Sequence, residues 1–130
     1  ANGGGTYLNE YSLVMDVCVV SLEGREYCSL LQTDPKNEVL GDWYIKGDGA
    51  VGCSQYGGRV EAGRWHRLAM VADLPNGRIT WYVDGEAVSG IADGRDGMIV
   101  ICDDRWALDS TCYLFRDKTA EDCAEVRLAA

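Results

Sequence analysis

A chain of 130 residues, 47% of them hydrophobic, can bury one core and is too short for two. Its formal net charge of −9 argues against a basic groove for nucleic acid and against adhesion to anionic lipid through a polybasic patch. No apolar run approaches the roughly 20 residues that a membrane-spanning helix needs, so membrane insertion is not expected.

Short apolar runs separated by turn residues predict a fold made of strands. Sixteen glycines and two prolines punctuate these runs, and no segment keeps a helical period. The sequence therefore predicts an all-β protein with strands at residues 10–20, 27–33, 42–46, 50–54, 65–73, 78–84, 86–89, 98–102, 111–116 and 124–128. A short helix over residues 119–129, with Thr119 as its N-cap, is the alternative to the last strand.

The clearest pattern is a hairpin of two alternating strands, 65–73 and 78–84. Every second residue in each strand is apolar, as expected for strands with one buried face. Together with strand 10–20, they predict an inward-facing set: Leu13, Met15, Val17, Leu68, Met70, Ile79, Trp81 and Val83.

Turn residues mark where the chain reverses between these strands. Pro75 fixes φ and Asn76-Gly77 accepts positive φ, which predicts the hairpin turn. Asp84-Gly85 predicts a further turn, and Asp48-Gly49 predicts a tight type I′ hairpin.

Several motifs, in register along nearly the whole chain, resemble one family. The Trp65-His66-Arg67 start and the Tyr82-Val83-Asp84-Gly85 end of the hairpin resemble the signature of laminin-G-like, concanavalin-A-like jelly-roll domains of the bacterial type. Residues 2–5, 9–17, 29–35, 44–47 and 104–109 fit the same family in the same order. The resemblance implies a single domain over 1–130, built as a two-sheet antiparallel jelly-roll sandwich, a fold that carries many functions.

The two ends of the chain differ from the family pattern. Relatives usually have strands before residues 2–5 and after the position of Ala130, so the domain is expected to lack terminal strands. A compact variant, a fragment and a subunit completed by a neighbour are three alternatives. Because strand 10–20 is long and apolar, we expect a partner segment from another copy or another chain against at least one terminal strand.

The six cysteines predict disulfides and an oxidising compartment. They contain no C-x-x-C pair, which argues against zinc-ribbon and thioredoxin-like sites. An even count in a small domain suits disulfides, with buried thiols as the alternative, and predicts a secreted, extracellular or cell-surface protein. Two pairs flank turns, and the pairing suggested is Cys18–Cys28, Cys112–Cys123 and, by remainder, Cys53–Cys102.

No catalytic constellation is recognisable, so the chain is predicted not to be an enzyme. The alternating acids of concanavalin-A-like glucanases are absent, as is a G-x-S-x-G elbow. His66, the single histidine, lies inside the strand pattern and is expected to be structural.

Candidate ligand-binding residues are aromatic side chains near turns or strand edges, which can stack on sugar rings. They are Trp43, Tyr44, Tyr56 and Trp106, with ordinary packing as the alternative for each. Tyr56 lies in a polar loop at 55–59. Trp65 and Trp81 are expected in the core because of their place in the hairpin motif.

A calcium ion is a candidate cofactor, because laminin-G-like domains often hold one at the sandwich rim. The candidate ligands are Asp103, Asp104 and Asp109, with Asp48, Asp93, Asp96 and Asp117 as weaker ones. Ordinary turn acids are the alternative.

Two functions are consistent with these features. The first is a non-catalytic extracellular binding module that recognises a glycan or a protein through rim loops. The second is a structural subunit of a surface or filament assembly, completed by strand addition from a neighbour.

Overall fold

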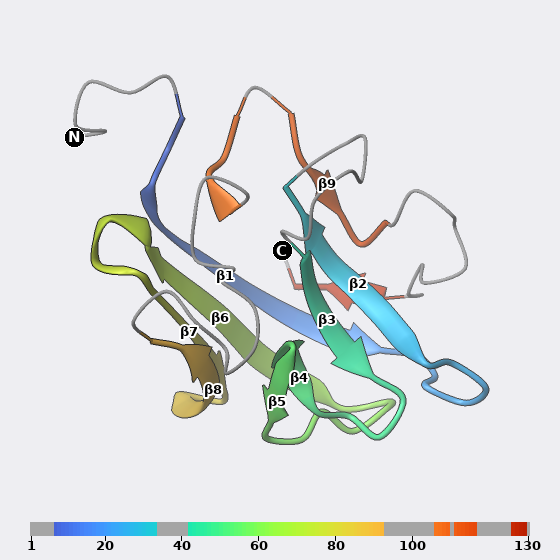
Figure 1. Ribbon diagram of the computed structural model, residues 1–130. Coiled ribbons are helices and arrows are strands. Elements are labelled where there is room, and N and C mark those ends of the chain that lie inside the picture. The colour runs from blue at the N-terminus through green and yellow to red at the C-terminus, as the bar shows by residue number, and fades with distance from the viewer. Residues whose placement is uncertain (1–6, 34–41, 93–105, 110, 117–125, 130) are drawn as a thin grey trace.

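Two antiparallel sheets of five strands each pack face to face in the computed structural model, as predicted (Figure 1). The model describes residues 7–33, 42–92, 106–109, 111–116 and 126–129. The β6 sheet has the order β10 (Val126–Leu128), β1 (Glu10–Val19), β6 (Trp65–Asp73), β7 (Arg78–Val83) and β8 (Glu86–Ile91). The β3 sheet has the order β5 (Gln55–Gly57), β4 (Val51–Cys53), β3 (Asp42–Lys46), β2 (Tyr27–Gln32) and β9 (Tyr113–Leu114).

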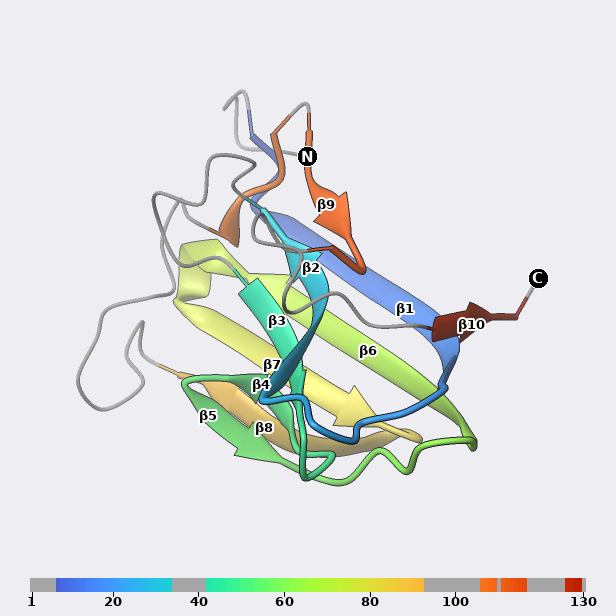
Figure 2. The same ribbon diagram turned by 90° about the vertical axis from the view of Figure 1, so that its right-hand side faces the viewer.

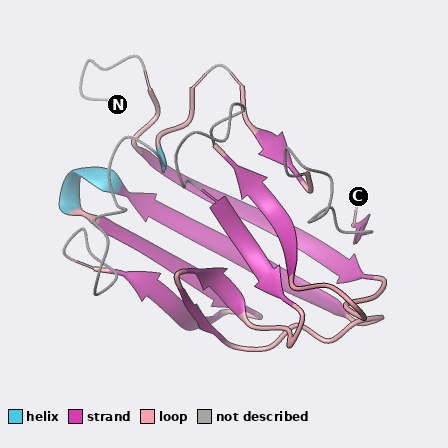
Figure 3. Cartoon of the chain, turned by 45° about the vertical axis from the view of Figure 1, so that its right-hand side comes forward, coloured by secondary structure: helices cyan, strands magenta, loops and turns pink. Residues whose placement is uncertain are grey.

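The strands follow the predicted order closely. At the C-terminal end, β10 confirms a strand rather than a helix over residues 126–128. The sequence did not predict β5, and β9 covers only two residues of the predicted strand 111–116. The predicted strand 98–102 lies outside the described residues. Strands dominate the described chain, with the 3₁₀ helix η1 (Leu74–Asn76) between β6 and β7 (Figure 3).

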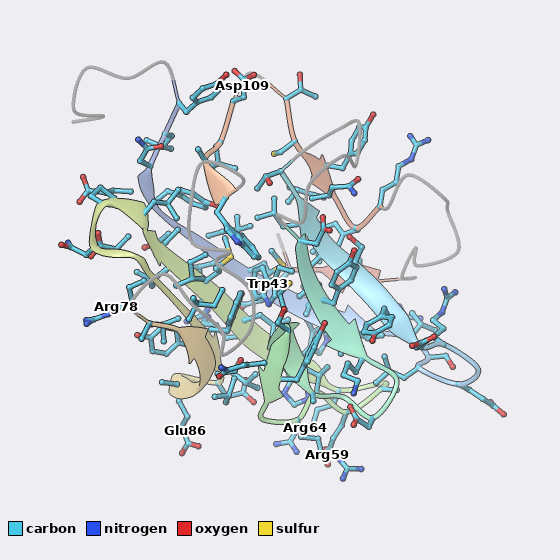
Figure 4. The ribbon with its side chains drawn as sticks, in the orientation of Figure 1. Trp43, Arg59, Arg64, Arg78, Glu86 and Asp109 are labelled. Atoms are coloured by element: carbon cyan, nitrogen blue, oxygen red, sulfur yellow. The ribbon has the colours of Figure 1, made fainter. Side chains whose placement is uncertain are left out.

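Side chains from both sheets fill the space between the layers. Of the predicted inward-facing set, seven residues are buried and Leu13 packs against them half-buried. Trp43 lies among the side chains between the sheets (Figure 4). The alternation that predicted the core is thus confirmed on β1, β6 and β7.

The predicted turns are present, with one difference in type. Asp84 and Gly85 have φ of 52° and 90°, as a type I′ turn requires, and Gly77 ends η1 at 62°. At the β3–β4 turn only Gly49 has a positive φ, 89°, and its N–H donates to the Lys46 carbonyl at 2.8 Å. This three-residue loop replaces the predicted type I′ turn because Asp48 instead uses Oδ1 to accept a hydrogen bond from the Ala50 N–H at 3.0 Å.

One side of the sandwich is closed where β5 lies beside β8 (Figure 2). Ser89 Oγ of β8 donates to the Val51 carbonyl of β4 at 2.7 Å, which joins the two sheets. A Cβ at Gly57 would lie 2.0 Å from the Val88 carbonyl oxygen, so the close approach of the two backbones requires glycine there.

Strand 10–20, which is too long and apolar to be expected as a bare edge, lies inside the β6 sheet. Its β1 is flanked by β6 on one side and, at residues 17–19, by β10 on the other (Figure 2). The chain's own C-terminal strand thus covers part of this edge. Among the described residues, the pairing of β10 with β1 covers residues 17–19. A partner strand beside β1 stays a prediction.

The suggested Cys18–Cys28 disulfide is not formed in this structure, where Cys18 carries a free thiol. Cys28 belongs to the core between the sheets, whereas Cys18 alternates with the inward-facing Val17 and Val19 and lies on the other side of the β6 sheet. Cys53 is also in the core and Cys112 is exposed, while their suggested partners, Cys102 and Cys123, lie outside the described residues. An oxidising compartment stays a prediction.

Within the described residues, no helix is both long and apolar enough to cross a membrane.

Candidate functional site

Trp65 is on the outer face of the β6 sheet, with 50% of its surface exposed. Along β6 the inward positions are taken by His66, Leu68 and Met70, so Trp65 shares the outward face with Arg67. The expectation that Trp65 lies in the core is wrong, whereas Trp81 is buried as predicted. An exposed indole gives this face a flat apolar surface.

A shallow hollow of about 580 Å³ lies beside this indole. Its walls come from β1, β6, the β7–β8 turn and the residue after β10. We call this hollow the Trp65 groove, and define it by Asp16, Trp65, Arg67, Asp84, Gly85 and Ala129, with His66 at its wall. The groove therefore combines one aromatic ring with two carboxylates and a guanidinium.

The carboxylate of Asp84 is held in place by two hydrogen bonds. Its Oδ1 accepts from the Arg67 backbone N–H at 2.9 Å, and its Oδ2 lies 2.8 Å from His66 Nδ1. These bonds, the backbone one first, lower the pKa of Asp84 below its usual value. Half of the side chain remains exposed, so the ionised carboxylate can accept further hydrogen bonds from a ligand.

His66 has the structural role that the sequence predicted. Its ring is buried, and Nε2 accepts a hydrogen bond from the Glu61 backbone N–H at 3.0 Å. The proton of the neutral ring is therefore on Nδ1, which donates to Asp84. Both ring nitrogens are occupied in positioning Asp84 and the residues before β6.

Asp16 and Arg67 form a two-bond ion pair at the middle of the same face. They are directly opposite each other on β1 and β6, and Nε and Nη2 of Arg67 each donate to one Asp16 oxygen at 2.7 Å. The pair lowers the pKa of Asp16, chiefly through its hydrogen bonds with Arg67. Both groups thus stay charged and fixed beside the groove.

Two of the four predicted ligand-binding aromatics are buried. Trp43 and Trp106 have no exposed surface. Trp106 packs edge-on against Trp81, with 5.8 Å between ring centroids. Their prediction as ligand platforms is wrong, because alternation on β3 turns Trp43 inward with Ile45, and the bridge between Leu8 and Leu108 holds Trp106 against the core.

The other two predicted aromatics, Tyr44 and Tyr56, both lie on the outer face of the β3 sheet. Tyr27 lies between them, with ring centroids 5.5 Å from Tyr44 and 6.3 Å from Tyr56, and Lys46 Nζ is 5.3 Å from the Tyr56 ring. Tyr56 belongs to β5 rather than to a loop, and burial raises the pKa of its hydroxyl. Sequence reasoning missed Tyr27. These rings, which we call the tyrosine cluster, pack mainly on one another.

The calcium prediction rests on residues that the structure describes only in part. Asp103 and Asp104 lie outside the described residues, as do Asp93, Asp96 and Asp117. Asp109 is exposed at the end of the sandwich opposite Arg59 and Arg64 (Figure 4). Over the described ranges, no three acidic, histidine or cysteine side chains are grouped so as to hold a metal ion. A calcium site stays a prediction.

Comparison with solved structures shows a shared fold. A candidate carbohydrate-binding protein from Bacteroides ovatus ATCC 8483 matches 97% of this chain with a TM-score of 0.65 and 19% identity. A sialidase matches 95% of the chain with a TM-score of 0.51 and 15% identity. A heptameric SAP-like pentraxin from Limulus polyphemus matches 73% of the chain and 56% of its own length, with a TM-score of 0.44 and 13% identity.

The chain spans 37% of the Bacteroides protein and 13% of the sialidase. No family model and no curated protein sequence matches it. The all-β two-sheet sandwich is therefore established, and its structural neighbours are jelly-roll-like. Membership in the laminin-G-like family stays a prediction.

Proposed function

We propose that this domain is a non-catalytic carbohydrate-binding module and that the Trp65 groove is its site. The observation that carries the proposal is a half-exposed indole next to two fixed carboxylates, Asp16 and Asp84. The apolar face of a pyranose ring can stack on the indole, while its hydroxyls donate hydrogen bonds to the carboxylates. Likeness to a candidate carbohydrate-binding protein adds support at the level of the fold.

The electrostatics of the groove favour binding over catalysis. Glycoside hydrolysis needs one carboxylic acid that is protonated near neutral pH, which requires a raised pKa. Hydrogen bonds lower the pKa of both Asp16 and Asp84. A lowered pKa makes either group a poor general acid, whereas both can accept hydrogen bonds from a sugar.

The test is a glycan array followed by calorimetry on the best neutral sugar. Trp65→Ala should weaken binding about tenfold, the loss expected for one aromatic stacking contact. Trp65→Phe should recover part of this loss because it restores a ring. Val71→Ala, on the same face of β6, is the control and should bind like the wild type. Equal binding by Trp65→Ala, or no binding to any glycan, would reject the proposal.

The second candidate function, a structural subunit completed by strand addition, rests on the short pairing between β1 and β10. Among the described residues this pairing covers residues 17–19 of β1, whereas β6 pairs with residues 10–18. An extended segment could add beside β1 through main-chain hydrogen bonds. Sedimentation that shows a stable monomer at micromolar concentration would count against this function.

A further inference from the structure

A second hollow, of about 390 Å³, adjoins the Trp65 groove. The two hollows share Asp16, Arg67 and Ala129, so the ion pair between Asp16 and Arg67 separates them without closing either. The far end of the second hollow is formed by Val14 and Leu128, which are 59% and 54% exposed. The face thus has two apolar patches, one on each side of a charged pair.

The length of this surface follows from the strand register. Trp65 is opposite Cys18, and Val14 is four residues before Cys18 on β1. At about 3.3 Å per residue, the two apolar patches are about 13 Å apart along the strand. The centres of two adjacent linked pyranose rings are closer together than that distance, whereas an oligosaccharide of three rings can reach both patches with its end rings.

We infer that the two hollows form one channel for a neutral oligosaccharide of at least three rings. One end ring stacks on Trp65, and the other contacts Val14 and Leu128. The Asp16–Arg67 pair then lies beside the hydroxyl groups of the middle ring. This inference rests on the proposed function, and it adds the length and the charge of the ligand.

The charges of the described lining residues disfavour an acidic sugar. Among these residues Asp16 and Asp84 are ionised and Arg67 is the one cation, with Arg64 acting on Asp84 from nearby. Two of the nitrogens of Arg67 already donate to Asp16, so its guanidinium cannot pair fully with a carboxylate on the ligand. The net charge of −9 on the chain repels an anion further.

The first experiment measures affinity against ligand length, with glucose, maltose and maltotriose and with cellobiose and cellotriose as probes. Affinity should rise at least about fivefold from the disaccharide to the better trisaccharide, and Val14→Ala should remove most of that gain. Trp65→Ala should weaken the binding of all three lengths alike, and Val71→Ala is the unaffected control. If affinity does not depend on length while Trp65→Ala still weakens binding, the channel is rejected and the proposed function stands.

The second experiment compares these neutral trisaccharides with trigalacturonate. Trigalacturonate should bind at least about tenfold more weakly, and Asp84→Asn should narrow the difference in affinity by removing one negative charge from the groove. Equal or tighter binding of trigalacturonate to the wild type would overturn the charge preference. Absence of binding to every probe would overturn both the channel and the proposed function.

Discussion

The outer faces of the two sheets both carry aromatic side chains, but the surroundings of these side chains differ between the two faces. On the β3 sheet, the rings of the tyrosine cluster lie against one another and against Lys46. On the β6 sheet, Trp65 is half exposed beside a hollow lined with fixed charges. An outward-facing aromatic is therefore not by itself a binding platform. The difference lies in whether its neighbour is another ring or a polar group at an open space.

The largest expected effect is a difference in stability between a variant of the buried Trp43 and a variant of the exposed Trp65. Trp43→Ala would leave a large cavity between the sheets and should reduce the free energy of unfolding by about 3–5 kcal/mol. Trp65→Ala should cost about 1 kcal/mol or less, because half of the side chain already contacts water. Urea unfolding at neutral pH measures both values. Similar losses for the two variants would contradict the assignment of Trp65 to the surface.

Strand alternation alone could have placed both tryptophans correctly. Trp43 is two residues before Ile45, which faces the core, and Trp65 is two residues before Arg67, which faces solvent. Their assignment from motif position or from nearness to a turn ignored this period of two. The same period placed the inward residues of β1, β6 and β7 correctly. The local pattern was thus a better guide to side-chain direction than the family resemblance.

Other features of the site depend on contacts between distant segments, which a single sequence does not reveal. The Trp65 groove needs Ala129, which reaches β1 only because its N–H donates to the Asp16 carbonyl at 3.1 Å. The tyrosine cluster needs β5, a three-residue strand that folds back on β4 and brings Tyr56 near Tyr27. Both β5 and β10, the strand before Ala129, have only three residues, which is too short to show a clear alternation in the sequence.

A smaller loss of stability is expected when the tyrosine cluster is disrupted. Tyr44→Ala removes the ring contact with Tyr27 and uncovers its neighbours, which should cost about 1–2 kcal/mol of unfolding free energy. Tyr44→Phe keeps the ring and should lose much less. Calorimetry with the same variants should show unchanged sugar affinity. If Tyr44→Ala is fully folded but binds the sugar more weakly, the sugar site lies on the β3 sheet instead.

The smallest effect concerns the charge on Asp84 and appears as a dependence of stability on pH. The pKa of Asp84 is lower in the folded state than its usual value of 3.8, because the Arg67 N–H and His66 donate to the ionised carboxylate. A lowered pKa stabilises the folded state at pH values above about 4, and this contribution is lost as the pH falls through the folded pKa. Because half of the side chain is exposed, water screens the interaction, and Asp84→Asn should cost about 1 kcal/mol or less at pH 7.

Unfolding of the wild type and of Asp84→Asn should be compared at several pH values between 7 and 2. The difference in free energy between them should stay constant from pH 7 to about 5 and shrink below about pH 4, where the wild-type carboxyl takes up a proton in the unfolded chain first. Asp109→Asn, at an exposed position, is the control for removal of one carboxylate from an acidic chain. A difference that is the same at pH 7 and pH 2 would show that the hydrogen bonds of Asp84, and not its charge, stabilise the β7–β8 turn. In that case Asp84 would still be ionised at neutral pH, because its usual pKa is 3.8, and it would remain a hydrogen-bond acceptor in the groove, but its charge would contribute nothing to the stability of the fold.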